Sequence, residues 1–146
     1  MKYINIMKIE IPCRSVNEGF ARTAVAAFAA QLDPTLEELN DIKTAVSEAV
    51  TNAIVHAYPD KIGLIRITVQ LFDGGVDISV KDTGCGIIDV KKAMEPLFTT
   101  GGEDRSGLGF TVMESLMDRL RVVSREGKGT TVRMRKLIPP RPSRRM

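Results

Sequence analysis

The chain has 146 residues, which suits one domain, and hydrophobic residues make up 43% of it, enough to bury a core. One histidine and two cysteines that lie far apart in the sequence, Cys13 and Cys85, argue against a disulfide framework and a structural zinc site. No apolar run could span a bilayer and no signal-peptide pattern opens the chain, so we expect a cytoplasmic protein without a membrane partner.

Basic residues gather at one end of the chain. The net charge is +3, and the C-terminal residues include Arg141, Arg144 and Arg145, so the rest of the chain is balanced. We therefore expect residues 1–138 to form the domain and residues 139–146 to form a basic, disordered tail. Aromatic residues make up only 5% and are not interleaved with a basic stripe, which argues against direct binding of nucleic acid.

The N-terminal part of the chain predicts a strand followed by a helix. Residues 3–11 carry β-branched residues in partial alternation, which is typical of a strand. Ser15 with Glu18 has the pattern of a capping box, which predicts a helix from there to about Gln31. Its expected buried stripe consists of Phe20, Ala24, Ala27 and Phe28.

A longer helix is expected after a break at Asp33-Pro34. Thr35 with Glu38 has the pattern of a second capping box, and Pro59 ends this helix at about Tyr58. Its expected inward residues are Leu36, Leu39, Ile42, Val46, Ala49, Val50 and Ala53.

The rest of the chain predicts two hairpins separated by helices. The expected strands are residues 64–72 and 76–81, joined at Asp73-Gly74-Gly75, and residues 121–125 and 130–137. Between the hairpins we expect a short helix over 89–94, a loop over 98–106 and a helix over 107–120. This order predicts an α+β fold, a two-layer sandwich in which helices cover one face of a mixed, largely antiparallel sheet.

Glu48, Asn52 and His56 recur every four residues in the long predicted helix. This spacing places the three side chains along one helical face, opposite the apolar face. A glutamate there could act as a general base, and an asparagine oxygen suits Mg²⁺. The same face could instead be an ordinary solvated surface, and for His56 a structural hydrogen-bonding role is favoured over catalysis.

Asp82 ends a predicted strand and is followed by Gly84 and Gly86. Glycines allow backbone conformations that other residues resist, and they let a flat ligand approach the main chain. The Asp82 carboxylate could accept a hydrogen bond from an exocyclic amine such as that of adenine. A tight turn capped by the aspartate would explain the same residues.

Residues 105–110 form a glycine-bearing stretch that opens a predicted helix. Free N–H groups and the dipole at a helix N-terminus favour phosphate, and Arg105 adds a permanent positive charge. A flexible loop leading into a glycine-rich helix start is the alternative. The stretch is neither the dinucleotide fingerprint nor a Walker motif.

In combination, these motifs resemble the Bergerat ATP-binding fold of the GHKL superfamily, which DNA gyrase and histidine kinases share. Their order is Glu-x-x-x-Asn on a helix, Asp-x-Gly-x-Gly after a strand, Gly-x-Gly at a helix start and Gly-x-Gly-Thr in a hairpin. Four segments are also similar to the sporulation anti-sigma F factors, whose relatives include the stress-response anti-sigma B kinases. These segments are residues 32–35, 47–54, 96–100 and 105–110.

The resemblance implies a role for each matching residue. Glu48 would be the base for an incoming serine hydroxyl, and Asn52 would hold Mg²⁺ against the phosphates of ATP. Asp82 would bind the adenine amine, with Thr130 supporting the same site. The remaining residues implied to bind the nucleotide are Gly84 and Gly86 at the base, Thr99 and Thr100 in a lid, Arg105 at the γ-phosphate, and Ser106, Gly107, Leu108 and Gly109 at the helix start.

The resemblance also implies partners. An anti-sigma F factor binds a sporulation sigma factor of the sigma F type, forms a homodimer and uses Mg-ATP to phosphorylate a serine on an anti-anti-sigma protein. Two alternatives stay open: a nucleotide-dependent sigma-binding module without significant kinase activity, and the stress-response (sigma B) type of the same kinase family.

Overall fold

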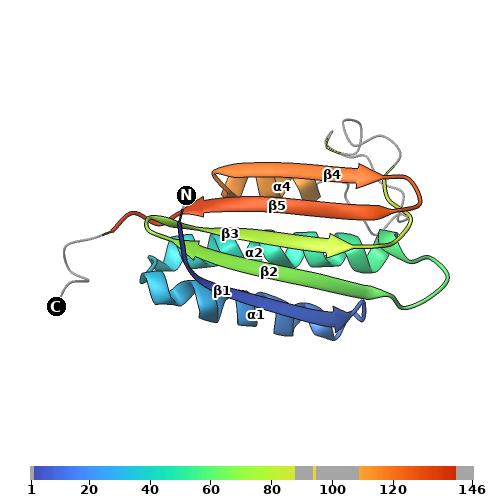
Figure 1. Cartoon of the computed structure of the whole chain (residues 1–146), viewed down its shortest axis with the longest axis horizontal. Coiled ribbons are helices and arrows are strands. Elements are labelled where there is room, and N and C mark those ends of the chain that lie inside the picture. Colours follow the sequence, from blue (N-terminus) through green and yellow to red (C-terminus); the bar gives the residue numbers. More distant parts are fainter. Residues whose placement is uncertain (1, 88–93, 95–108, 141–146) are drawn as a thin grey trace.

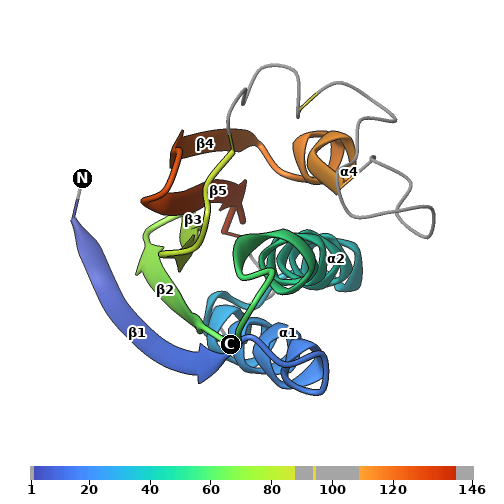
Figure 2. The ribbon, with the colours of Figure 1, turned by 90° about the vertical axis from the view of Figure 1, so that its right-hand side faces the viewer.

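The computed structural model of the chain describes residues 2–87, 94 and 109–140, and it has one five-stranded sheet with helices against one face (Figure 1, Figure 2). The expected two-layer α+β fold is therefore confirmed. The elements in chain order are β1 (Tyr3–Pro12), α1 (Asn17–Ala29), η1 (Ala30–Leu32), α2 (Leu36–Asn52), η2 (Ala53–Ala57), β2 (Leu64–Phe72), β3 (Gly75–Asp82), α4 (Gly109–Leu116), β4 (Arg119–Arg125) and β5 (Gly129–Leu137).

The strand order in the sheet is β1-β2-β3-β5-β4. All four pairings between these described strands are antiparallel, whereas a mixed sheet was expected. The reason lies in the connection from β3 to β4, which skips one position in the sheet. β5 fills that position, so β3 and β4 run in the same direction without being neighbours (Figure 1).

Only one of the two predicted capping boxes forms. The Thr35 hydroxyl accepts the N–H of Glu38 at 3.1 Å, and the Glu38 carboxylate accepts the N–H of Thr35 at 2.8 Å. The Ser15 box is wrong, because α1 begins after a turn in which the carbonyl of Ser15, not its side chain, accepts the N–H of Glu18. Glu18 instead forms an ion pair with Arg22, one helical turn along.

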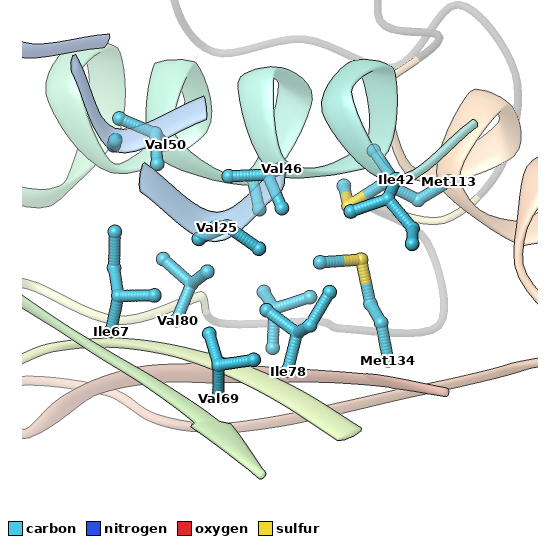
Figure 3. Packing of buried hydrophobic residues seen from close by; sticks show 14 of the residues in the cluster. Val25, Ile42, Val46, Val50, Ile67, Val69, Ile78, Val80, Met113 and Met134 are labelled. Carbon is cyan, nitrogen blue, oxygen red and sulfur yellow. The ribbon is translucent and has the colours of Figure 1, made fainter. Parts of the chain in front are cut away.

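The core lies between the helices and the inner face of the sheet (Figure 3). The expected inward residues of α2 are largely confirmed, although Leu36 is 79% exposed. The stripe predicted for α1 is right for Phe28, which packs against the core, and wrong for Phe20, which is 57% exposed, and for Ala27, which is also exposed. Four smaller residues point inward instead: Ala21, Val25, Ala26 and Ala29.

The long helix changes its hydrogen-bonding pattern after Asn52. α2 is α-helical, and η2 continues it as a π-helix, so the helical run ends at Ala57, close to the expected Tyr58. A π-helix bonds each residue to the fifth along rather than the fourth, so a step of four falls short of a full turn there. The spacing from Asn52 to His56 therefore differs from the uninterrupted α-helical spacing that was predicted.

α4 ends at Leu116, although a helix to residue 120 was expected. The Asp118 N–H donates to the carbonyl of Arg135 at 2.8 Å, and the Asp118 carboxylate accepts the N–H of Leu137 at 2.7 Å. These bonds join the chain to β5, so β4 begins at Arg119. The predicted short helix except Met94, the predicted loop over 98–106, the start of the predicted third helix and residues 141–146 lie outside the described residues.

Asp77 joins three strands on the outer face of the sheet. Its carboxylate accepts two hydrogen bonds from Arg135, at 2.7 and 2.8 Å, and one from the Tyr3 hydroxyl at 2.7 Å. Burial raises the pKa of Asp77, but the hydrogen bonds from Arg135 and Tyr3 outweigh burial and lower the pKa overall. This cluster stabilises the sheet on the side away from the helices.

Candidate functional site

The candidate site begins where the inner face of the sheet changes from apolar to polar. On β3, β5 and β4, neighbouring inward side chains form two apolar rows and then a polar row of Asp82, Thr130 and Ser124. Polar side chains at core positions need mutual hydrogen bonds, and these have them. The two apolar rows consist of Ile78, Met134 and Leu120, then Val80, Val132 and Val122.

Asp82 is the one buried charged side chain in the described part of the chain, at 8% exposed. Its Oδ1 accepts the N–H of Gly84 at 3.0 Å and the N–H of Thr130 at 3.2 Å. Burial raises the pKa of the Asp82 carboxyl, and the two backbone hydrogen bonds partly oppose that effect. Among the described residues none donates to Oδ2, so this oxygen can still accept a hydrogen bond from a ligand.

The segment Asp82–Gly86, here called the glycine loop, docks on the π-helix η2. The Cys85 N–H donates to the carbonyl of Ala57 at 2.8 Å, and the Cys85 thiol donates to the carbonyl of His56 at 3.0 Å. A β-carbon at Gly84 would overlap the carbonyl of Ala57, and Gly86 has a φ of +77°, which disfavours other residues. Gly84 is therefore required by the docking of the loop on η2, and Gly86 by its own backbone conformation and by its close approach to the carbonyl of Arg125.

Tyr58 also holds the glycine loop, although its sequence position predicts no role in the site. Its hydroxyl donates to the carbonyl of Leu64 at 2.8 Å and accepts the N–H of Thr83 at 2.9 Å. The tyrosine thus connects the end of η2, the start of β2 and the residue after Asp82. The sequence feature that could have indicated this role is the aromatic residue just before Pro59, which ends the helix.

Gly109, where the described part of α4 begins, comes close to the Glu48–Asn52 face of α2. A β-carbon at Gly109 would lie 3.2 Å from Glu48 Oε2 and 3.2 Å from both amide atoms of Asn52. Glu48 and Asn52 are both half-buried, and they remain one turn apart on the α-helical part of the run. The structure thus brings together a carboxylate, an amide and the first described turn of α4.

Ser124 was not singled out from the sequence, although its position could have revealed it. In β4 the inward positions are Leu120, Val122 and Ser124, so the serine interrupts an apolar alternation. Its hydroxyl contacts that of Thr130 at 2.8 Å and the carbonyl of Gly129 at 3.1 Å, and it accepts the N–H of Ile87 at 2.7 Å.

Several predicted site residues cannot be placed. They lie outside the described residues: Thr99, Thr100, Arg105, Ser106, Gly107 and Leu108. Within the described ranges, no group of three His, Cys, Asp or Glu side chains is arranged to hold a metal ion. The helices of those ranges are also too short or too polar to cross a membrane.

Comparison with known sequences gives a consistent result. Residues 13–136 match the family described as histidine kinase-like ATPase domain. The chain is 60% identical over 139 residues to the anti-sigma F factor of Caldanaerobacter subterraneus subsp. tengcongensis, covering 94% of this chain and 97% of that protein. It is 54% identical over 136 residues to the anti-sigma F factor of Geobacillus kaustophilus, covering 92% of this chain and 93% of that protein.

Solved structures support the same fold. The RsbU and RsbW domains of Rv1364c from Mycobacterium tuberculosis match 94% of this chain with a TM-score of 0.68 and 23% identity, and the match spans 33% of that longer chain. The catalytic domain of the histidine kinase ThkA matches 94% of this chain and all of that chain, with a TM-score of 0.59 and 18% identity.

Proposed function

The chain belongs to the histidine kinase-like ATPase family and, within it, to the anti-sigma F factors, and on that premise we propose that it both inhibits a sigma factor and phosphorylates a protein serine. The acceptor would be a serine on an anti-anti-sigma protein, the antagonist of the inhibition. ATP would be the phosphoryl donor. The sporulation sigma factor of the F type is the proposed target because the relatives at 53–60% identity carry that name.

One observation carries the proposal: a single helical run connects the two ends of the candidate site. Glu48 and Asn52 lie beside Gly109, and η2, at the end of the same run, holds the glycine loop with Asp82. From Glu48 to Asn52 the α-helical part of the run extends roughly 6 Å at about 1.5 Å per residue, and η2 continues it to Ala57. This layout supports a ligand with a base at the Asp82 end and phosphates at the Glu48 end.

The residues present suit phosphoryl transfer, which depends mainly on positioning and charge stabilisation. The Glu48 carboxylate would take the serine proton as the serine oxygen bonds to the γ-phosphorus. The bond from that phosphorus to the bridging oxygen would break, and ADP would leave. At the other end, Asp82 Oδ2 would accept a hydrogen bond from the adenine amine, while Oδ1 stays bound to the backbone.

Mg²⁺ would neutralise phosphate charge in this site when bound. Asn52 is the proposed protein ligand, since Mg²⁺ keeps several waters and takes its other ligands from phosphate oxygens. The arrangement of Asn52 next to Glu48 and Gly109 fits this role, because the metal and the phosphates would share the space at the start of α4.

Transfer of labelled phosphate tests the enzymatic part directly. The protein is mixed with Mg-ATP carrying a labelled γ-phosphate and with a candidate anti-anti-sigma protein. We expect the label on a serine of that protein and none on a control in which the acceptor serine is alanine. Binding of the sigma factor and of the anti-anti-sigma protein without any label, across a range of pH, would instead support a nucleotide-dependent binding module.

A homodimer is the further part of this proposal. β1 is an edge strand of ten residues, and Ile4 and Ile6 on it are 60% and 47% exposed. Long exposed edges are sites where strands of another copy can pair. We expect sedimentation to give twice the 16.0 kDa chain mass, and Ile6→Lys to give monomers. Ile62→Lys, at an exposed isoleucine outside the strand, is the control; a monomeric unaltered protein would contradict the proposal.

A further inference from the structure

We propose that Ser124 is a positioning residue that sets which base the nucleotide site accepts, because it takes the hydroxyl hydrogen of Thr130. The inference rests on the proposed function, in which Asp82 and Thr130 lie at the base. It goes further in assigning a role to a residue that no motif identified. It also predicts the chemical class that is rejected: purines with a carbonyl in place of the amine.

The contacts of Ser124 define its hydrogen bonds. Its Oγ accepts the N–H of Ile87 at 2.7 Å, lies 3.1 Å from the carbonyl oxygen of Gly129 and lies 2.8 Å from Thr130 Oγ1. All three contacts are partly buried, so an unmade hydrogen bond here would be costly. Ser124 is thus the meeting point of the segment after Gly86, the β4–β5 hairpin and Thr130.

The number of hydrogens on each group then determines which of the two hydroxyls, Ser124 or Thr130, is the donor. A serine hydroxyl has one hydrogen to donate and two lone pairs. The carbonyl of Gly129 can only accept, so the Ser124 hydrogen goes there. The hydrogen between Ser124 and Thr130 must therefore come from Thr130, and this is the one arrangement that satisfies all three contacts at once.

Thr130 consequently directs both of its hydrogens into the protein. Its N–H donates to Asp82 Oδ1, and its hydroxyl donates to Ser124. Within the described ranges, what remains at this end of the site is a pair of acceptors, the lone pairs of Thr130 Oγ1 and of Asp82 Oδ2. Two acceptors suit a base that carries an exocyclic amine, directly or through a water molecule, and repel a base with a carbonyl at the same place.

Adenine carries an amine at C6, where hypoxanthine carries a carbonyl, and the adjacent N1 bears a hydrogen only in hypoxanthine. In Ser124→Ala the Thr130 hydroxyl loses its acceptor and can rotate to donate outward. We expect the affinity for ATP to fall and that for inosine triphosphate to hold or rise. The ratio of the two affinities should then drop by about tenfold, roughly the loss of one hydrogen bond.

The measurement is calorimetric titration of the full chain with ATP and with inosine triphosphate. Ser79→Ala, a serine on the outward-facing side of β3, is the control and should keep the unaltered ratio. A merely structural role of Ser124 would weaken both nucleotides equally. An unchanged ratio in Ser124→Ala would therefore overturn the inference.

A second variant keeps the inference testable if Ser124→Ala folds poorly. Thr130→Val removes the hydroxyl at nearly constant shape and should lower the same ratio. Because Ser124 acts through Thr130, the effects on the ratio should not add in the double variant. Additive effects would overturn the inference, whereas failure of the unaltered protein to bind ATP would overturn the proposed function as well.

Discussion

Glu48→Gln lowers phosphoryl transfer to the anti-anti-sigma protein by about 10²–10⁴-fold, the usual contribution of a general base, while ATP affinity is largely kept. Glutamine preserves the shape of the side chain, which matters because Glu48 lies close to Gly109 and Asn52. It cannot take up the serine proton. The loss should therefore appear in the transfer step and not in nucleotide binding.

The measurement for Glu48 is a single-turnover transfer rate at saturating ATP, with nucleotide affinity determined separately. Glu114→Gln, at an exposed glutamate on α4, serves as the control and should transfer at the unaltered rate. A Glu48→Gln rate near that of the unaltered protein would show that the carboxylate is not the base. Equal losses in affinity and rate would mean that Glu48 acts in binding.

Elements governed by local chemistry could be predicted from the sequence. All five strands were predicted to within about two residues, because alternation and turn glycines act locally. The capping box at Thr35 forms for the same reason. The identical pattern at Ser15 does not, because β1 leads into α1 through a turn that fixes the backbone of Arg14–Glu18 before any side chain can cap it.

The buried side of α1 shows where local reasoning fails. Hydrophobicity favoured Phe20 and Phe28 as the inward residues, yet Phe20 is exposed and Phe28 only partly buried, while Ala21, Val25 and Ala29 are fully buried. Several faces of this alanine-rich helix are apolar enough to be buried. The helix packs close to α2 and the sheet, and small residues fit at that distance. The sequence of the helix alone does not predict how closely it packs.

The candidate site was predictable in part. Motif spacing identified Asp82 and the glycines after it. The structure shows why the glycines are needed: Gly84 packs against η2, and Gly86 has a positive φ and packs against the carbonyl of Arg125. The π-helix itself was not predictable, and it changes the spacing from Asn52 to His56. Tyr58 and Ser124 were not identified because their importance lies in contacts with residues far along the chain.

Asp82→Asn lowers ATP affinity by about 10–100-fold, the range expected for a hydrogen bond to a charged group. The asparagine oxygen can still accept the N–H groups of Gly84 and Thr130 in place of Oδ1. Its NH₂ group then stands where Oδ2 was and meets the adenine amine donor to donor. Calorimetric titration with ATP measures the loss.

The same variant should not destabilise the fold. Burial raises the pKa of Asp82 in the folded protein, so the ionised form costs stability as pH rises from about 3.9, the unfolded value, through the higher folded value. Asparagine carries no charge and removes this cost. At neutral pH we therefore expect Asp82→Asn to unfold at the same urea concentration as the unaltered protein, or at a higher one.

Asp77→Asn is the matched control, because Asp77 lies on the same strand but on the outer face. Its pKa is lowered in the folded protein, so it contributes stability above about pH 3.9, and this contribution is lost as pH falls through the lower folded value. Asp77→Asn should keep ATP affinity and lose about 1–3 kcal/mol of stability at neutral pH, a loss that shrinks on acidification. The two variants should thus have opposite effects. If Asp82→Asn lost stability and kept affinity, its carboxylate would serve the fold alone, and the adenine role would have to be abandoned.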